Sequence, residues 1–211
     1  MDEKLRSYLT RSLPPTDDWV EELERIAEDE NVPIMDPIGI NFVMQLIRLK
    51  RPNRILEVGS AIGYSALRML EANPNATIVT VERDEQRYNQ AVQNVWKLGV
   101  QDNIQIIFGD AIEILSELKE DNKFDLVFID AAKGQYKRFF ELSSPLLSEN
   151  GFILSDNVLF KGFIADPEKE HPRFQKLARK IREYNEWLIQ HPDYVTTIVP
   201  IGDGVAISNK K

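Results

Sequence analysis

The chain has 211 residues, of which 43% are hydrophobic and 28% are charged, a composition typical of a globular protein with a substantial core. It contains no cysteine, which excludes disulfides, thiolate metal sites and cysteine nucleophiles. The net charge of −8 argues against a broad nucleic-acid surface, although a local basic patch is compatible with it.

Amphipathic helices are predicted in the first fifty residues. Apolar side chains recur at helical spacing in Asp17–Glu30 and again in Asp36–Lys50, and Pro33 separates the two segments. We interpret residues 1–50 as a helical N-terminal extension.

From residue 54 onward, apolar strands alternate with helical segments. The strands are predicted at Arg54–Val58, Thr77–Val81, Ile104–Phe108, Phe124–Ile129 and Phe152–Leu154. The helices that follow the first four strands are predicted at Ile62–Glu71, Asp84–Leu98, Ala111–Leu118 and Tyr136–Leu147. Repeated strand–helix units imply an α/β fold with a parallel, doubly wound sheet and right-handed crossovers.

The C-terminal part adds a loop, a helix and a hairpin. The loop spans Asn157–Pro172, the helix Arg173–Ile189 and the last two strands Tyr194–Val199 and Gly204–Ser208. The connection between these strands is too short for a parallel crossover, so the last strand is expected to be antiparallel. No linker divides the chain, and we expect residues 1–211 to form one domain.

No membrane contact is expected. No apolar run approaches the ~20 residues that a transmembrane helix needs. The first residues, Met-Asp-Glu-Lys-Leu-Arg, lack the apolar region of a signal peptide. We therefore expect a cytoplasmic protein.

Acidic side chains end successive strands, as in a nucleoside site. Gly59 begins a glycine-containing turn, Glu82 ends the second strand 23 residues later, and Asp110 ends the third. Acids suit ribose hydroxyls and an adenine amino group but would repel a pyrophosphate, which favours S-adenosylmethionine over NAD. An acid before a helix could instead be a cap. Glu57 either contacts the cofactor or orients the glycine turn.

A second group of polar residues follows the fourth and fifth strands. Asp130, Asp156 and Asn157 offer two carboxylates and an amide carbonyl, an all-oxygen set that suits Mg²⁺, Mn²⁺ or Ca²⁺ better than zinc. Lys133 is a candidate general base beside them, and the alternative is a salt bridge from Lys133 to Asp130.

Basic residues concentrate near the predicted C-terminal helix, despite the acidic total. We consider five of them candidate RNA contacts: Lys161, Arg173, Lys176, Arg179 and Lys180. The alternative for this patch is a solvated helix face. Phe160 and Phe163 could stack on an unpaired base, or they could pack in the core.

These motifs resemble the cation-dependent O-methyltransferases, the family of catechol and caffeoyl-CoA O-methyltransferases. The resemblance rests on Glu57-Val-Gly-Ser-Ala-Ile-Gly-Tyr-Ser65, Glu82, Gly-Asp110-Ala111, Ile-Asp130-Ala-Ala-Lys133-Gly-Gln-Tyr136 and Ser-Asp156-Asn157, and it covers nearly the whole chain. It implies a Rossmann-like class I methyltransferase fold with a seven-stranded, mostly parallel sheet and helices on both faces. It also implies Mg²⁺ on Asp130, Asp156 and Asn157, with Lys133 as the base. Cofactor contacts are implied for Met35, Ser65, Glu82, Asp110, Ala111 and Asp130.

Within this family, the chain most resembles the bacterial tRNA 5-hydroxyuridine methyltransferases. Shared stretches are Ile-Asp-Ala-Ala-Lys-Gly-Gln-Tyr, Asp-Asn-Val-Leu-Phe-Lys-Gly and His-Pro-Asp-Tyr…Gly-Asp-Gly. The resemblance implies methylation of 5-hydroxyuridine at the tRNA wobble position, recognition of the anticodon loop, and a homodimer. The alternatives are a small-molecule enzyme of catechol or caffeoyl-CoA type, and a non-catalytic binding module on the same scaffold.

Overall fold

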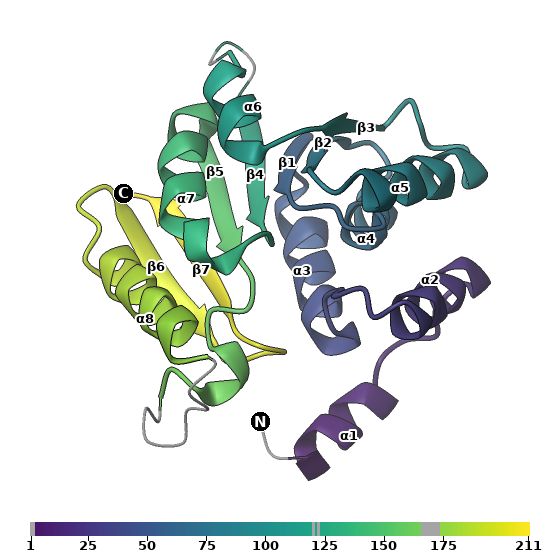
Figure 1. Ribbon diagram of the computed structural model, residues 1–211, viewed down its shortest axis with the longest axis horizontal. Helices are drawn as coiled ribbons and strands as arrows, with labels where there is room; N and C mark the ends of the chain where they lie inside the picture. Colours follow the sequence, from purple (N-terminus) through teal and green to yellow (C-terminus); the bar gives the residue numbers. More distant parts are fainter. Residues whose placement is uncertain (1–2, 120, 122, 166–173) are drawn as a thin grey trace.

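A seven-stranded sheet in the order β3-β2-β1-β4-β5-β7-β6 organises the chain (Figure 1). The computed structural model describes residues 3–119, 121, 123–165 and 174–211. The strands are β1 (Arg54–Val58), β2 (Thr77–Glu82), β3 (Ile104–Phe108), β4 (Phe124–Ile129), β5 (Leu147–Ser155), β6 (Tyr194–Val199) and β7 (Val205–Lys210).

Strand direction agrees with the predicted topology. Strands β1 to β5 pair in parallel, whereas β7 pairs antiparallel with both β5 and β6. The predicted hairpin and antiparallel last strand are thus confirmed. The hairpin turns back so that β7 lies inside the sheet and β6 forms its edge.

Helices cover both faces of the sheet, as predicted (Figure 1). The α-helices are α1 (Glu3–Arg11), α2 (Asp18–Asp29), α3 (Pro37–Lys50), α4 (Tyr64–Ala72), α5 (Glu85–Lys97), α6 (Ala111–Glu117), α7 (Tyr136–Ser143) and α8 (Gln175–Ile189). Short 3₁₀ turns are η1 (Lys133–Gln135), η2 (Ser144–Leu146) and η3 (Phe160–Gly162). One core packs α2 to α5 on the sheet, and the other packs α6 to α8 on the opposite face, because successive strand residues point to alternate sides.

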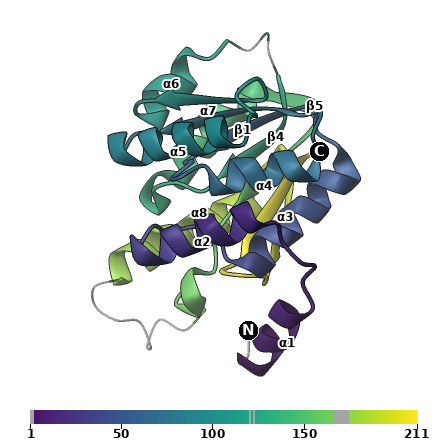
Figure 2. The ribbon, with the colours of Figure 1, turned by 90° about the vertical axis from the view of Figure 1, so that its right-hand side faces the viewer.

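The N-terminal extension contains one helix that the apolar pattern did not delimit. Helix α1 has no buried residue and projects from the rest of the molecule (Figure 2). Helices α2 and α3 agree with the predicted segments and contribute buried side chains to the first core. The chain between α2 and α3 crosses the end of the sheet, where it forms part of the pocket described below.

Strand β5 is longer than predicted. Only Phe152–Leu154 shows an apolar run, yet the strand begins at Leu147, which pairs with Phe124 before the register shifts. Glu149 and Asn150 are exposed, so this part of the strand carries no hydrophobic signal. Likewise the predicted helix to Leu147 ends at Ser143 and continues as η2, because Pro145 interrupts the helical hydrogen bonds.

Candidate active site

A pocket of about 290 Å³ lies at the carboxyl ends of the five parallel strands β1 to β5. This is the edge where open α/β sheets bind ligands. All the residues predicted to bind cofactor or metal or to act as base line this pocket, with the exception of Glu57: Met35, Gly59, Ser65, Glu82, Asp110, Ala111, Asp130, Lys133, Asp156 and Asn157. The structure thus brings both predicted sites together in one cavity.

Gly59 allows the turn after β1 to approach the end of β4. Its φ is 98°, and a Cβ at this position would lie 2.4 Å from the carbonyl oxygen of Asp130. Only glycine fits such a contact without a backbone shift. The turn therefore exposes backbone at the floor of the pocket, where a ligand can come close.

Glu82 connects the turns that follow β1 and β2. Its carboxylate accepts backbone N–H groups of Ala61, Arg83 and Asp84, each at 2.9 Å. The side chain still lines the pocket, and a carboxylate has about four acceptor positions. Glu82 can therefore hold both turns and accept a further donor from a ligand.

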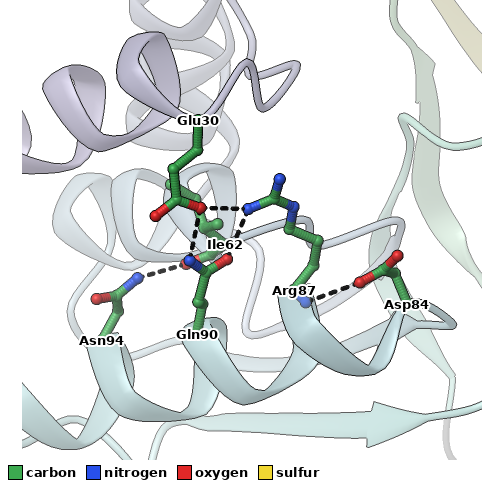
Figure 3. Close-up of polar contacts among 6 residues, drawn as sticks. All are labelled: Glu30, Ile62, Asp84, Arg87, Gln90 and Asn94. Carbon is green, nitrogen blue, oxygen red and sulfur yellow. Dashed lines mark hydrogen bonds and ion pairs between the residues drawn. The ribbon is translucent and has the colours of Figure 1, made fainter.

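Asp110 is both a helix cap and a pocket residue. Its Oδ1 accepts the N–H of Ile112 at 2.8 Å at the start of α6, and the side chain also lines the pocket. Asp84, by comparison, caps α5 by accepting from Arg87 at 3.0 Å and lies outside the lining (Figure 3). Capping a helix and contacting a ligand, the two alternatives for an acid at a strand end, are therefore compatible at Asp110.

Glu57 lies beneath the pocket rather than in its lining. It is fully buried and accepts the hydroxyl groups of Ser65 and Thr80, each at 2.5 Å. Burial is the main cause that raises the Glu57 pKa from 4.5 to about 7, while the two hydroxyl donors oppose the shift. The geometry favours the orienting role over direct cofactor contact, because Ser65 stands between Glu57 and the cavity.

The segment between α2 and α3 supplies an outer wall to the pocket. Pro33 and Ile34 line it together with Met35, yet sequence reasoning selected only Met35, through the resemblance. Tyr64 and Phe139 are further lining residues that it missed. Helical periodicity marks these two as apolar positions, but whether they face a core or a cavity depends on how the helices pack.

A polar cluster fixes this wall to α5 (Figure 3). Glu30 Oε2 accepts from Arg87 Nη1 at 2.7 Å and from Gln90 Nε2 at 2.8 Å. On the same helix Asn94 donates to the carbonyl oxygen of Ile62 at 2.9 Å. Helix α5 thereby holds both the C-terminal end of α2 and the glycine-containing turn.

Asp130, Asp156 and Asn157 line the pocket where β4 and β5 end. Asn157 has a left-handed φ of 55°, and its Nδ2 donates to Asp156 Oδ2 at 2.8 Å. Burial raises the pKa of both Asp130 and Asp156, and the neighbouring charge of Asp130 adds to the effect on Asp156. A cation placed between them would relieve this cost. No group of three His, Cys, Asp or Glu suited to a metal occurs in the described part of the chain, and the candidate set here has two acids and an amide.

Lys133 contacts this group through Asn157. Its Nζ donates to Asn157 Oδ1, one of the three predicted metal-binding side chains. Among the described residues no direct ion pair joins Lys133 to Asp130. The charge of Lys133 still acts on Asp130, because it lowers the Asp130 pKa against the larger effect of burial. Lys133 is half-buried in the η1 turn and faces the cavity.

The predicted RNA contacts are only partly described. Lys176, Arg179 and Lys180 are exposed on α8. Arg173 lies outside the described residues, and the side chain of Lys161 in η3 is likewise not described.

Phe160 packs against the other phenylalanines near η3 instead of facing solvent. Phe160 is 8% exposed and lies with Ala178 and Ile181 of α8. Its ring centroid is 5.7 Å from both Phe163 and Phe174. The idea that Phe160 stacks on a nucleic-acid base is therefore wrong, because its surface is already used in this cluster.

The sheet order and the pocket at its carboxyl edge define a Rossmann-like α/β protein with the fold of solved methyltransferases. The chain belongs to the O-methyltransferase family, whose model matches residues 13–211. A caffeoyl-CoA O-methyltransferase of Stellaria longipes is 28% identical, and the alignment covers 99% of this chain and 90% of that protein.

Solved structures of such proteins superpose over nearly the whole chain. A Staphylococcus aureus protein of the caffeoyl-CoA O-methyltransferase type is 36% identical, with a TM-score of 0.87 over 99% of this chain and 98% of that one. An SAH-bound methyltransferase from Podospora anserina is 26% identical, with a TM-score of 0.89 over 99% and 94%. In the part of the chain that the structure describes, no helix is both long enough and apolar enough to span a bilayer.

Proposed function

We propose that this protein is an S-adenosylmethionine- and Mg²⁺-dependent O-methyltransferase whose acceptor carries two neighbouring oxygens. One observation carries the proposal: a single pocket is lined by Glu82 and Asp110, at the ends of β2 and β3, and by Asp130, Asp156 and Asn157, which follow β4 and β5 on the other side of β1. A methyl donor and an oxygen acceptor bound by these two sets of residues would meet within a single cavity, and such positioning supplies much of the rate of a transfer reaction.

The donor end suits S-adenosylmethionine. Glu82 can accept ribose hydroxyls and Asp110 an adenine amino group, and the backbone of the Gly59 turn is open to the ligand. Binding of SAH by the Podospora anserina relative supports this choice. The buried Glu57 holds Ser65 in place at this end through its hydroxyl group.

The acceptor end fits a hard divalent cation. Asp130, Asp156 and Asn157 offer oxygen donors, and the two carboxylates are held against a burial cost that a cation would remove. When bound, the ion would favour ionisation of the acceptor hydroxyl and orient its neighbouring oxygen. The ammonium of Lys133 donates to Asn157 Oδ1, which joins the proposed base to one of these oxygen donors.

Lys133 is the proposed base. As the acceptor oxygen bonds to the methyl carbon, the carbon–sulfur bond of the sulfonium breaks and leaves a neutral thioether. Lys133 in its neutral form takes the hydroxyl proton, and its position in the short η1 turn keeps Nζ at the acceptor end of the cavity.

The proposed acceptor is 5-hydroxyuridine at the wobble position of tRNA, which would become 5-methoxyuridine. The stretches shared with tRNA 5-hydroxyuridine methyltransferases support this choice, as do the exposed Lys176, Arg179 and Lys180 of α8. A caffeoyl-CoA-type acceptor is the second candidate. The names of the Stellaria longipes and Staphylococcus aureus relatives favour it, and a catechol offers the same pair of oxygens.

Transfer of labelled methyl from S-adenosylmethionine tests the proposal. Acceptors are tRNA bearing unmethylated 5-hydroxyuridine, caffeoyl-CoA and a catechol panel, each with and without EDTA. We expect EDTA-sensitive label on the tRNA, restored by Mg²⁺ and lost in Asp156→Ala. Label on phenols alone would select the second candidate. Cofactor binding without transfer to any acceptor would favour a non-catalytic module.

A further inference from the structure

A second cavity lies directly beside the active-site pocket. Its volume is about 290 Å³, and its wall includes Lys133, Lys137, Lys180, Glu183, Tyr184 and Trp187. Lys133 lines both cavities, whereas its neighbours divide between them: Gln135 lines the pocket and Tyr136 this second space. The start of α7 thus separates the two. We call the second space the lysine cavity.

The lysine cavity has an excess of positive charge. Lys137 and Lys180 line it with one acid, Glu183, whose Oε1 lies 3.7 Å from Arg179 Nε. The third lysine of the lining, Lys133, directs its Nζ to Asn157 in the active-site pocket. Within the described part of the chain, neither Lys137 nor Lys180 forms an ion pair. Lys137 Nζ lies 5.1 Å from the centroid of the Trp187 ring. Lys180 Nζ approaches Gly134, where a Cβ would lie 3.5 Å from it. Lys137 lies beside an aromatic ring and Lys180 beside a glycine. Neither neighbour carries a negative charge, so both ammonium groups remain available to an anion.

The floor of the cavity is anchored in the core. Trp187 stacks on Tyr184 with ring centroids 6.0 Å apart, and Tyr184 shares a 2.7 Å hydrogen bond with Ser155 at the end of β5. Asp156, a proposed metal ligand, is the next residue. The lysines of the cavity are therefore presented on a platform whose position relative to the acceptor site is set by β5.

We propose that the lysine cavity binds a phosphate group of the acceptor whose reacting ring occupies the active-site pocket. The inference rests on the proposed function, because it assumes a phosphate-bearing acceptor. The ammonium groups of Lys137 and Lys180 can recognise phosphate as point charges. Lys133, the proposed base, lines both cavities and so lies between the phosphate and the reacting ring. The phosphate could belong to an RNA backbone or to a coenzyme A thioester, and the experiment distinguishes these sources.

Direct binding is the first measurement. The probe is a fluorescent anticodon stem-loop RNA carrying 5-hydroxyuridine, titrated in EDTA without methyl donor. The test variant is Lys137→Ala/Lys180→Ala. Its control is Arg138→Ala, which removes an exposed cation from α7 that does not line the cavity. We expect the double variant to bind about tenfold more weakly, with a salt slope smaller by about two because each lysine contributes about one. Arg138→Ala should bind like wild type.

Steady-state kinetics identify the source of the phosphate. The ratio of kcat/KM for the stem-loop RNA to that for free 5-hydroxyuridine should fall in the double variant but not in Arg138→Ala. A matching ratio compares caffeoyl-CoA with caffeic acid. A fall confined to the thioester ratio would support the phosphate site while refuting the tRNA assignment. If neither ratio falls, or if Arg138→Ala lowers them equally, the proposal is overturned.

Discussion

Lys133 lines both the active-site pocket and the lysine cavity. Two substitutions distinguish its proposed role as general base from the effect of its positive charge. Lys133→Ala should lower kcat by roughly 10²–10⁴-fold, the usual range for general acid–base catalysis. Binding of S-adenosylmethionine, measured by calorimetry, should survive because the donor end is formed by other residues. Lys133→Arg keeps the charge but cannot lose its proton. It should be as inactive as the alanine variant, and substantial turnover in Lys133→Arg would refute the role as base.

Glu57 makes stability depend on pH in a direction that its burial dictates. Since burial raises its pKa from 4.5 to about 7, the folded state binds more protons than the unfolded state between these values. The free energy of unfolding must therefore fall as pH rises through this range. At about 1.4 kcal/mol per pKa unit, the contribution is roughly 3 kcal/mol.

Glu57→Gln removes this titration while keeping the size of the side chain. Urea unfolding from about pH 5 to about pH 8 should show a shallower loss of stability for the variant than for wild type. The difference between the two proteins isolates Glu57, because Asp130 and Asp156 titrate in both. Parallel pH profiles would show that Glu57 is not protonated on folding in this range.

At the scale of elements, the contact between α2 and α5 should control cofactor affinity. Glu30→Ala removes the bonds to Arg87 and Gln90 and frees the wall formed by Pro33, Ile34 and Met35. Because exposed ion pairs contribute little to stability, Tm should change little. The Kd for S-adenosylmethionine should rise several-fold, as measured by calorimetry.

A second contact between α2 and α5, nearer the start of α2, provides the control. Glu22 pairs with Lys97 at 2.6 Å, so it also joins α2 to α5, but it lies away from the pocket lining. Glu22→Ala should affect Tm about as much as Glu30→Ala while leaving the Kd unchanged. An equal loss of affinity in both variants would mean that the whole of α2, and not its contact at Glu30, positions the wall.

These elements also show what can be read from local sequence. The parallel strands and the helices after them were predictable because their buried positions are apolar and recur at strand or helix spacing. The first half of β5 was not, since Glu149 and Asn150 are exposed and the strand begins with the pairing of Leu147 to Phe124 on a distant strand. The position of β7 inside the sheet likewise depends on a distant partner.

The site follows the same rule. Asp130 and Asp156 follow predicted strands. Their closeness in the fold was predictable because the carboxyl ends of parallel strands meet at one edge of the sheet. Glu57 lies within β1, near the same edge, but its side chain contacts Ser65 and Thr80 below the cavity, and the apolar pattern of the strand does not show this. Lys137 and Trp187 meet only because α7 packs against α8, so no motif in either segment marks the lysine cavity.

At the scale of the whole molecule, α1 suggests how two copies associate. Leu5, Tyr8 and Leu9 recur at helical spacing, and Leu5 and Tyr8 are 51% and 62% exposed. A helix of this length is marginal in water unless its apolar face is covered. Although α1 contacts α3, it projects beyond the main body of the molecule (Figure 2), and Leu5 and Tyr8 stay exposed. We infer that a second copy of the protein covers this face, which gives the homodimer that the family resemblance implies.

Light scattering with matched charge substitutions tests this inference. Leu5→Asp/Tyr8→Asp places acids on the apolar face and should convert a dimer into a monomer, because burying an unpaired carboxylate is costly. Ser7→Asp introduces the same group on the opposite side of α1 and should leave the dimer intact. A monomeric wild type, or a double variant that remains dimeric, would exclude α1 as the interface. The activity of a monomeric variant on free 5-hydroxyuridine would then show whether one subunit contains a complete site.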